Sequence, residues 1–238
     1  MRGIAEHSKQ RYRAGIRRRS VLPSNKSFKR TAAPPLNSSV IRTGGFMGFA
    51  ISWLAVSGKA PEQVLKELRL NRTGENEEIP ESPISAAQLP NNWFLVFINE
   101  FGSPIVSANS LASLSTNCKV VSCQIEEHVM FSSATLYSDG TESWRVAHDA
   151  QEGMFNLSTN GQLPSEFAGI YTSLKEKQEE AGGAKANVDY IHDVPVTLAQ
   201  VVTSFRHDED IPGSEPIPFE VLDQDITKAL SKPWWKLW

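Results

Sequence analysis

Residues 119–149 read KVVSCQIEEHVMFSSATLYSDGTESWRVAHD and carry the clearest pattern of strands and turns in the chain. Three runs rich in β-branched and aromatic residues, 119–126, 129–137 and 142–148, are typical of strands. Asp139-Gly140 between the last two is a strong signal for a two-residue hairpin turn. The stretch therefore predicts three consecutive antiparallel strands at the centre of a sheet.

The preceding sequence adds two strands and two short helices. Residues 49–56 and 93–98 are apolar and β-branched enough for largely buried strands. Pro61 is a favourable first helical residue before an apolar face, and Ser107 is a suitable cap for a second short helix. Residues 71–92 are polar and interrupted by prolines, so we expect a connection without regular structure.

The following sequence is mainly helical in pattern. Apolar residues recur at helical spacing from Phe167 and predict a helix of about 16 residues that stops before Gly182-Gly183. We expect a second helix from Pro195 and a third over residues 222–230. Strands first and helices later predict an α+β fold, a single domain over residues 47–238 with helices packed on one face of a mainly antiparallel sheet.

The first 46 residues differ from the rest in charge. They hold 11 basic residues and one acid, a net charge of +10, whereas residues 47–238 hold 13 bases and 26 acids, a net charge of −13. A segment so basic and poor in apolar residues cannot offset its ordering entropy, so we expect a disordered leader. It is either an inert tail, a basic arm for polyanions, or translated sequence that precedes a natural start at Met47.

The third reading rests on residues 27–40, SFKRTAAPPLNSSV. This segment resembles the translated recombination sites that flank integron gene cassettes. The resemblance implies a genomic context and no activity. The acidic body disfavours nucleic acid as a partner unless the basic leader is present in the natural protein and ordered.

Composition also suggests where the protein resides. We find no apolar run near the length of a membrane span and no convincing secretory signal, and expect a cytoplasmic protein without a transmembrane segment. Cys118 and Cys123 lie five apart in an extended segment, where their side chains point to opposite faces. We therefore expect two reduced thiols and no disulfide.

Histidines beside carboxylates are the strongest chemical candidates: Glu126-Glu127-His128, His148-Asp149, His192-Asp193 and His207-Asp208. Imidazole and carboxylate suit metal binding or general acid–base catalysis, and the candidate catalytic residues are Glu126, His128, His148 and Asp149. Neighbours in a strand point to opposite faces, so each pair offers one ligand at most. Recognised nucleophile, phosphate-binding and metal-ligand motifs are missing from the sequence, and we expect no tightly bound metal and no cofactor.

Tryptophans are the candidate binding residues. Trp144 shares a strand face with Val146 and His148, which lines either a pocket or the core. Trp234, Trp235 and Trp238 lie within five residues of one another. They pack against their own domain, form a contact with a protein partner or a second copy, or rest on a membrane surface.

One resemblance covers the body, from Met47-Gly48-Phe49 through residues 127–134, EHVMFSSA, to His207-Asp208-Glu209. The body resembles a family of small cytosolic bacterial proteins that has no assigned activity, so the resemblance implies no site. Two hypotheses follow from the residues. We favour an acidic protein-interaction module, of the immunity or accessory type, carried on a mobile gene cassette. The alternative is a metal-assisted, hydrolase-like enzyme that uses the histidines and carboxylates.

Overall fold

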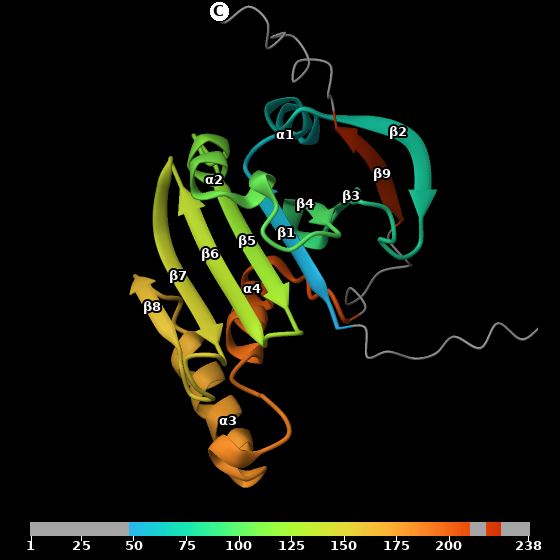
Figure 1. Cartoon of the computed structure of the whole chain (residues 1–238). Coiled ribbons are helices and arrows are strands. Elements are labelled where there is room, and N and C mark those ends of the chain that lie inside the picture. The colour runs from blue at the N-terminus through green and yellow to red at the C-terminus, as the bar shows by residue number, and fades with distance from the viewer. Residues whose placement is uncertain (1–47, 210–217, 225–238) are drawn as a thin grey trace, which may run out of the picture. The chain divides into compact units, whose positions relative to one another are not determined.

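The computed structural model describes residues 48–209 and 218–224, which belong to one compact unit, residues 45–238 (Figure 1). The strands are β1 (Ala50–Ser57), β2 (Leu70–Glu77), β3 (Ile84–Gln88), β4 (Trp93–Ile98), β5 (Lys119–Glu126), β6 (Phe131–Ser138), β7 (Thr141–Asp149), β8 (Ser158–Gly161) and β9 (Phe219–Gln224). The α-helices are α1 (Pro61–Leu68), α2 (Ala108–Leu114), α3 (Phe167–Glu180) and α4 (Asp193–Thr203). Short 3-10 turns are η1 (Pro90–Asn92), η2 (Pro104–Val106) and η3 (Gly183–Lys185).

All nine strands form one antiparallel sheet in the order β2-β9-β3-β4-β1-β5-β6-β7-β8. Strand β1 is central and pairs with β4 on one side and β5 on the other. Asp139 and Gly140, which join β6 to β7, have φ angles of 50° and 81°. A two-residue turn with positive φ at both positions matches the twist of the flanking strands, as the sequence predicts.

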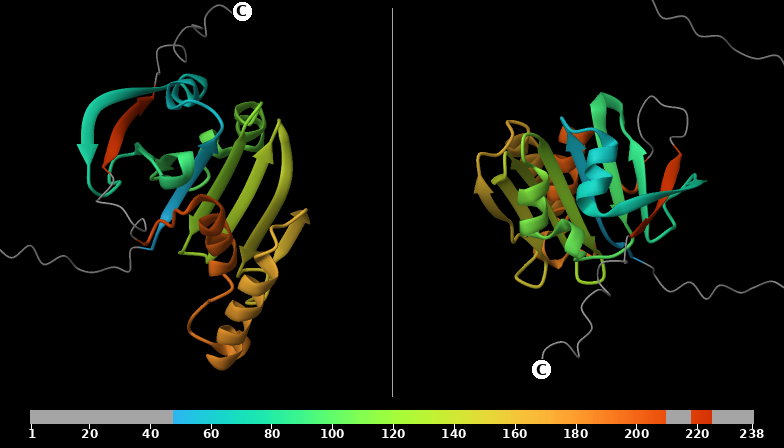
Figure 2. Two further views of the ribbon diagram at one scale, coloured as in Figure 1. Left: turned by 180° about the vertical axis from the view of Figure 1, so that it is seen from behind. Right: turned by 90° about the horizontal axis from the view of Figure 1, so that it is seen from above.

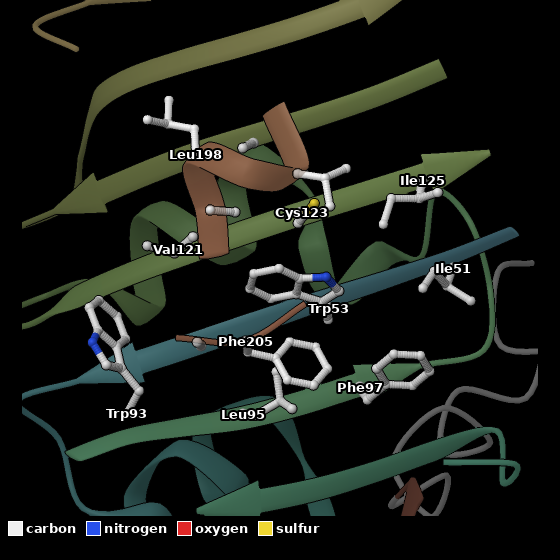
Figure 3. Close-up of a cluster of buried hydrophobic side chains, with 14 of the residues drawn as sticks. Ile51, Trp53, Trp93, Leu95, Phe97, Val121, Cys123, Ile125, Leu198 and Phe205 are labelled. Carbon is white, nitrogen blue, oxygen red and sulfur yellow. The ribbon is translucent and has the colours of Figure 1, made fainter. Parts of the chain in front are cut away.

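The first hydrophobic core lies between the sheet and the helices α3 and α4. Strand β1 contributes Ile51, Trp53 and Ala55 to this face, and α4 covers it with Leu198 and Ala199. Figure 3 shows the Trp53 indole beside Phe205, with the two ring centroids 5.3 Å apart and the rings perpendicular. Because α4 also contacts β5, β6 and β7, it holds the middle of the sheet from this side.

The second core lies on the opposite face of the sheet. Alternation along β1 places Leu54 and Val56 there, where they pack with Val64 and Leu65 of α1 and Leu111 of α2. The two views in Figure 2 show α4 on one side of the sheet and α1 and α2 on the other. Burial on both faces explains why β1 reads as a continuous apolar run rather than an alternating one.

The predicted α+β class and antiparallel sheet are confirmed, with several corrections of detail. Helices cover both faces of the sheet, because α1 and α2 close the second core. Residues 71–92 contain most of β2 and all of β3, so the expected connection is wrong. Residues 219–224 form a strand where the start of a helix was expected, and β8 was not predicted. Helix α3 has 14 residues, and α4 begins two residues before Pro195.

Both cysteines are free and buried, Cys118 in the second core and Cys123 in the first, as the predicted opposite orientation requires. The leader, the start at Met47 and the tryptophans at 234, 235 and 238 lie outside the described residues.

Candidate functional site

The candidate site is the face of β5, β6 and β7 that points away from α4. Ile125 of β5 lies in the core beneath α4, so its neighbours Gln124 and Glu126 point to the other face. The cross-strand register extends this assignment to the adjacent strands. We call the resulting surface the polar face, and it consists of Ser122, Gln124, Glu126, Phe131, Ser133, Thr135, Arg145, Ala147 and Asp149.

Helix α2 contacts β5 and β6 from this side. Figure 1 shows it in front of the sheet near the β6–β7 turn, with none of the described helices in front of the other end of these strands. The polar face is therefore open at the end where Glu126, Phe131 and Asp149 lie.

Three hydroxyl groups form the floor of the polar face. Ser122 is the cross-strand partner of Thr135, and Ser133 is the partner of Gln124. None of the three hydroxyls makes a hydrogen bond within the described residues, and none is among the fully enclosed polar atoms that lack a partner. A hydroxyl group can donate one hydrogen bond and accept two, and these three residues are only 3–9% exposed, so the floor holds unused hydrogen-bonding capacity beneath the longer side chains of the face.

The rim of the polar face carries longer side chains. Nδ1 of His128 lies 2.6 Å from Oε1 of Glu126, which also accepts the backbone N–H of His128. The His128 side chain is 59% exposed, and its Nε2 has no partner within the described residues. Phe101 packs edge-on against Phe131 beside this pair. Glu126 thus holds an exposed imidazole in a fixed orientation at the edge of the face.

Arg145 and Glu142 form the opposite part of the rim. Nε of Arg145 lies 3.9 Å from Oε1 of Glu142, and the amide of Asn160 donates to that same oxygen. More than half of the Arg145 side chain is exposed, so a surface pair of this length stabilises the fold little. Arg145 remains available for a bound molecule, whereas Glu142 already accepts hydrogen bonds from Asn160 and Tyr137.

His148 has a different environment, although it neighbours Asp149 in sequence. Its side chain points into the core beneath α4 and is fully buried. Nδ1 faces the carbonyl oxygen of Asn156 at 2.6 Å, and Nε2 faces Oδ2 of Asp189 at 2.9 Å. Both ring nitrogens thus face hydrogen-bond acceptors, and one of these acceptors is a carboxylate.

Asp189 completes this buried pair and anchors the start of α4. Its Oδ1 accepts the backbone N–H groups of Ile191 and His192. Burial pushes the pKa of Asp189 upward, but its hydrogen bond to His148 and that ring's charge outweigh burial and hold the pKa below its usual range. The pair therefore joins β7 to the segment that leads into α4.

His192 and Ser132 make a similar connection between β6 and the segment that leads into α4. The Ser132 hydroxyl donates to the carbonyl oxygen of His192 at 2.6 Å, and Nε2 of His192 lies 3.2 Å from the carbonyl oxygen of Phe131. Burial lowers the pKa of His192, and its ring is enclosed. These groups are occupied by backbone contacts and serve the fold.

The four predicted catalytic candidates are thus divided by the sheet. Glu126 and His128 are in contact, Asp149 lies on the same face two strands away, and His148 lies on the opposite face. Within residues 48–209 and 218–224 there is no group of three or more histidine, cysteine, aspartate or glutamate side chains that could hold a metal ion. Trp144, proposed as a binding residue, is 3% exposed and belongs to the first core.

Sequence reasoning missed Asp189 and the floor hydroxyls. Asp189 lies 41 residues from His148, and no local pattern joins the two. The serines and threonine read as ordinary strand residues, because their lack of partners depends on what covers the sheet.

Comparisons with protein-family models, with curated proteins and with solved structures find no match. Among the described helices, none has the length and apolar character needed to cross a membrane.

Proposed function

We propose that the protein is an acidic binding module that holds a basic segment of a partner protein on the polar face. The observation that carries this proposal is the set of unpaired hydroxyl groups of Ser122, Ser133 and Thr135, residues only 3–9% exposed at the floor of the polar face, with carboxylates at its rim. A polypeptide offers backbone and side-chain groups that can satisfy these hydroxyls.

The net charge of the described residues indicates what kind of polypeptide binds. The described residues contain 10 basic and 23 acidic side chains, a formal charge of −13. Glu126, Glu142 and Asp149 border the polar face, against one cation, Arg145. Such a surface attracts basic partners, accelerates their association and repels acidic ones.

The two buried thiols are compatible with a reducing compartment. We place the module in the cytoplasm, as an immunity or accessory protein of a mobile gene cassette.

Amide chemical shifts of the full chain test the binding face. The probes are a synthetic peptide of lysine, threonine and tyrosine, and an otherwise identical peptide with glutamate in place of lysine. We expect the basic peptide alone to shift residues 122–126, 131–135 and 145–149. Shifts centred on α3 or on β2 and β9, or equal binding of the acidic peptide, would contradict the proposal.

A charge-matched pair of variants separates this face from general acidity. Glu126→Gln with Asp149→Asn should weaken peptide binding by roughly two- to fivefold per carboxylate, the range of an exposed ion pair. Glu176→Gln with Glu180→Gln removes the same charge from exposed positions of α3 and should have little effect. Equal losses in both variants would indicate binding by overall charge only.

The enzyme alternative keeps one specific observation, the oriented and exposed imidazole of His128. Zinc or manganese titration, followed through the ring proton signals of His128, tests it. A saturable change at one equivalent of metal that disappears in Glu126→Gln would favour the metal-assisted enzyme over the binding module.

A further inference from the structure

Strands β3 and β9 separate along their length. They pair only at Ser85 with Val221 and Ala86 with Glu220. Beyond Val221, β9 continues alongside β2 until Gln224 pairs with Leu70. The next pair that a continuous ladder would contain, Ile84 with Leu222, is missing. The sheet therefore opens between these two strands as β9 approaches its end.

A cavity of about 520 Å³ occupies this opening. Its apolar floor is formed by Ile84, Ile98 and Leu222 of the second core, which are 2–6% exposed and reach the cavity with only a small part of their surface. Glu100 and Asp223 stand at its rim, and neither carboxylate forms an ion pair within the described residues. The cavity thus combines an apolar floor with unpaired negative charge.

Two further hollows lie close to the same place. One of about 480 Å³ is lined by Leu65 of α1 and by Leu70, the cross-strand partner of Gln224. The other, about 340 Å³, lies between α1 and α2 and shares Arg69 with the first. Two of these cavities therefore border the end of β9, one at Gln224 and the other at its cross-strand partner Leu70.

The 14 residues that follow Gln224 have complementary chemistry. Residues 225–238, DITKALSKPWWKLW, carry three tryptophans, three lysines and one aspartate. Trp234 lies ten positions after Gln224, and a chain of ten steps spans at most about 36 Å when extended. Trp234 and Trp235 can therefore return to a cavity whose wall includes Gln224 itself.

We propose that the segment of residues 232–238 folds back and places Trp234 and Trp235 in the cavity between β3 and β9. The indoles cover Ile84, Ile98 and Leu222, and the neighbouring lysines lie beside Glu100 and Asp223. Cavities of this size accommodate aromatic groups with most of their surface buried. The segment completes the second core at the place where the sheet is open, and this inference is independent of the binding function of the polar face.

A nitroxide at position 236 of the full chain tests the proposal. In Lys236→Cys carrying the label, amide signals of Ile84, Ile98, Asn99 and Leu222 should lose most of their intensity, while those of β7 and β8 should not. The wild-type chain treated with the same reagent is the control for Cys118 and Cys123, which are buried. Unchanged signals at the cavity would overturn the proposal.

Two further measurements identify the occupant. An isotope-labelled wild-type chain mixed with the nitroxide chain should show no broadening; broadening in this mixture would mean that the segment docks on a second copy. In the labelled chain, Trp234→Ser with Trp235→Ser should abolish the broadening, and Trp238→Ser should preserve it. If Trp238→Ser abolishes it equally, the assignment to Trp234 and Trp235 is wrong.

Discussion

At the level of single residues, His207 and His148 differ in the free-energy cost of burying the imidazole ring. His207 is enclosed, and both of its ring nitrogens lack a hydrogen-bond partner within the described residues. Its ring packs edge-on against Phe49, with the centroids 4.7 Å apart. Burial lowers the pKa of His207, and the charge of Asp208 opposes this effect without overcoming it. His148, by contrast, uses both ring nitrogens.

We expect His207→Leu to be neutral or to raise the free energy of unfolding by up to about 1 kcal/mol, because it removes two unsatisfied polar atoms. His148→Leu should lower it by about 3–5 kcal/mol, because the Asp189 carboxylate then remains buried without its partner. Urea unfolding at neutral pH measures both. Equal losses in the two variants would contradict this account.

His207 and His192 predict that the free energy of unfolding depends on pH. The folded pKa values of His207 and His192 are lowered, so below about 6.5 the unfolded chain binds protons that the folded chain does not. Their contribution to stability is therefore present above about pH 6.5 and is lost as the pH falls. The free energy of unfolding should decrease from pH 7.5 to 5.5, and His207→Leu should reduce that decrease. An unchanged slope in the variant would show that His207 does not contribute.

At the element scale, the edge strand β8 depends on one glycine. Gly161 has φ of 75°, and a Cβ atom added there would lie 2.1 Å from the carbonyl oxygen of Ser143 on β7. Trp144 is its cross-strand partner, so the close approach fixes the pairing of β7 with β8.

Gly161→Ala should therefore lower the free energy of unfolding by about 1–3 kcal/mol, from both backbone strain and the clash. Gly169→Ala is the matched control, because Gly169 lies within α3 and a Cβ atom there would meet nothing within 4 Å. It should raise stability by about 1 kcal/mol through helix propensity. Thermal unfolding of both variants checks the opposite signs, and a loss in both would count against the argument.

The elements predictable from sequence are those whose burial is visible in the residue pattern. Strands β1 and β4 to β7 carry apolar or alternating runs that bury at least one face. Strand β2 reads LNRTGENE and exposes most of its side chains, so its pairing with β9 leaves no periodic signal. Arg72 of β2 pairs with Glu220 of β9 across 148 residues of sequence. Contacts between residues so far apart in sequence form only when the whole sheet assembles.

The candidate site was likewise predictable from the sequence only in part. The contact between Glu126 and His128 is local and was available from their spacing, and strand alternation already separated His148 from Asp149. The unpaired hydroxyls and the role of Asp189 required knowledge of which face each helix covers.

At the scale of the whole molecule, the two proposed surfaces lie on the same side of the sheet. The polar face occupies β5 to β7, and the cavity lies between β3 and β9, with both on the side of α1 and α2. The opposite side is covered by α3 and α4 and contains the buried histidine contacts. Glu126 and Asp149 of the polar face belong to neither core, so variants at these two positions should leave folding largely intact.

Residues 1–46 lie outside the described residues and differ from the rest of the chain in charge. The described residues of both cores span 51–222, and β1 begins at Ala50. The leader's net charge of +10 and low apolar content give it little to bury. We expect deletion of residues 1–46 to shift the thermal midpoint by less than about 2 °C, which corresponds to less than about 1 kcal/mol for a chain of this size.

Calorimetry at physiological salt makes the comparison, and a longer deletion through Ser57 is the control. That deletion removes the central strand between β4 and β5 and should abolish the cooperative transition. A fall of many degrees after deletion of residues 1–46 alone would mean that the leader is part of the fold, and the interpretation of it as translated recombination-site sequence would then be wrong.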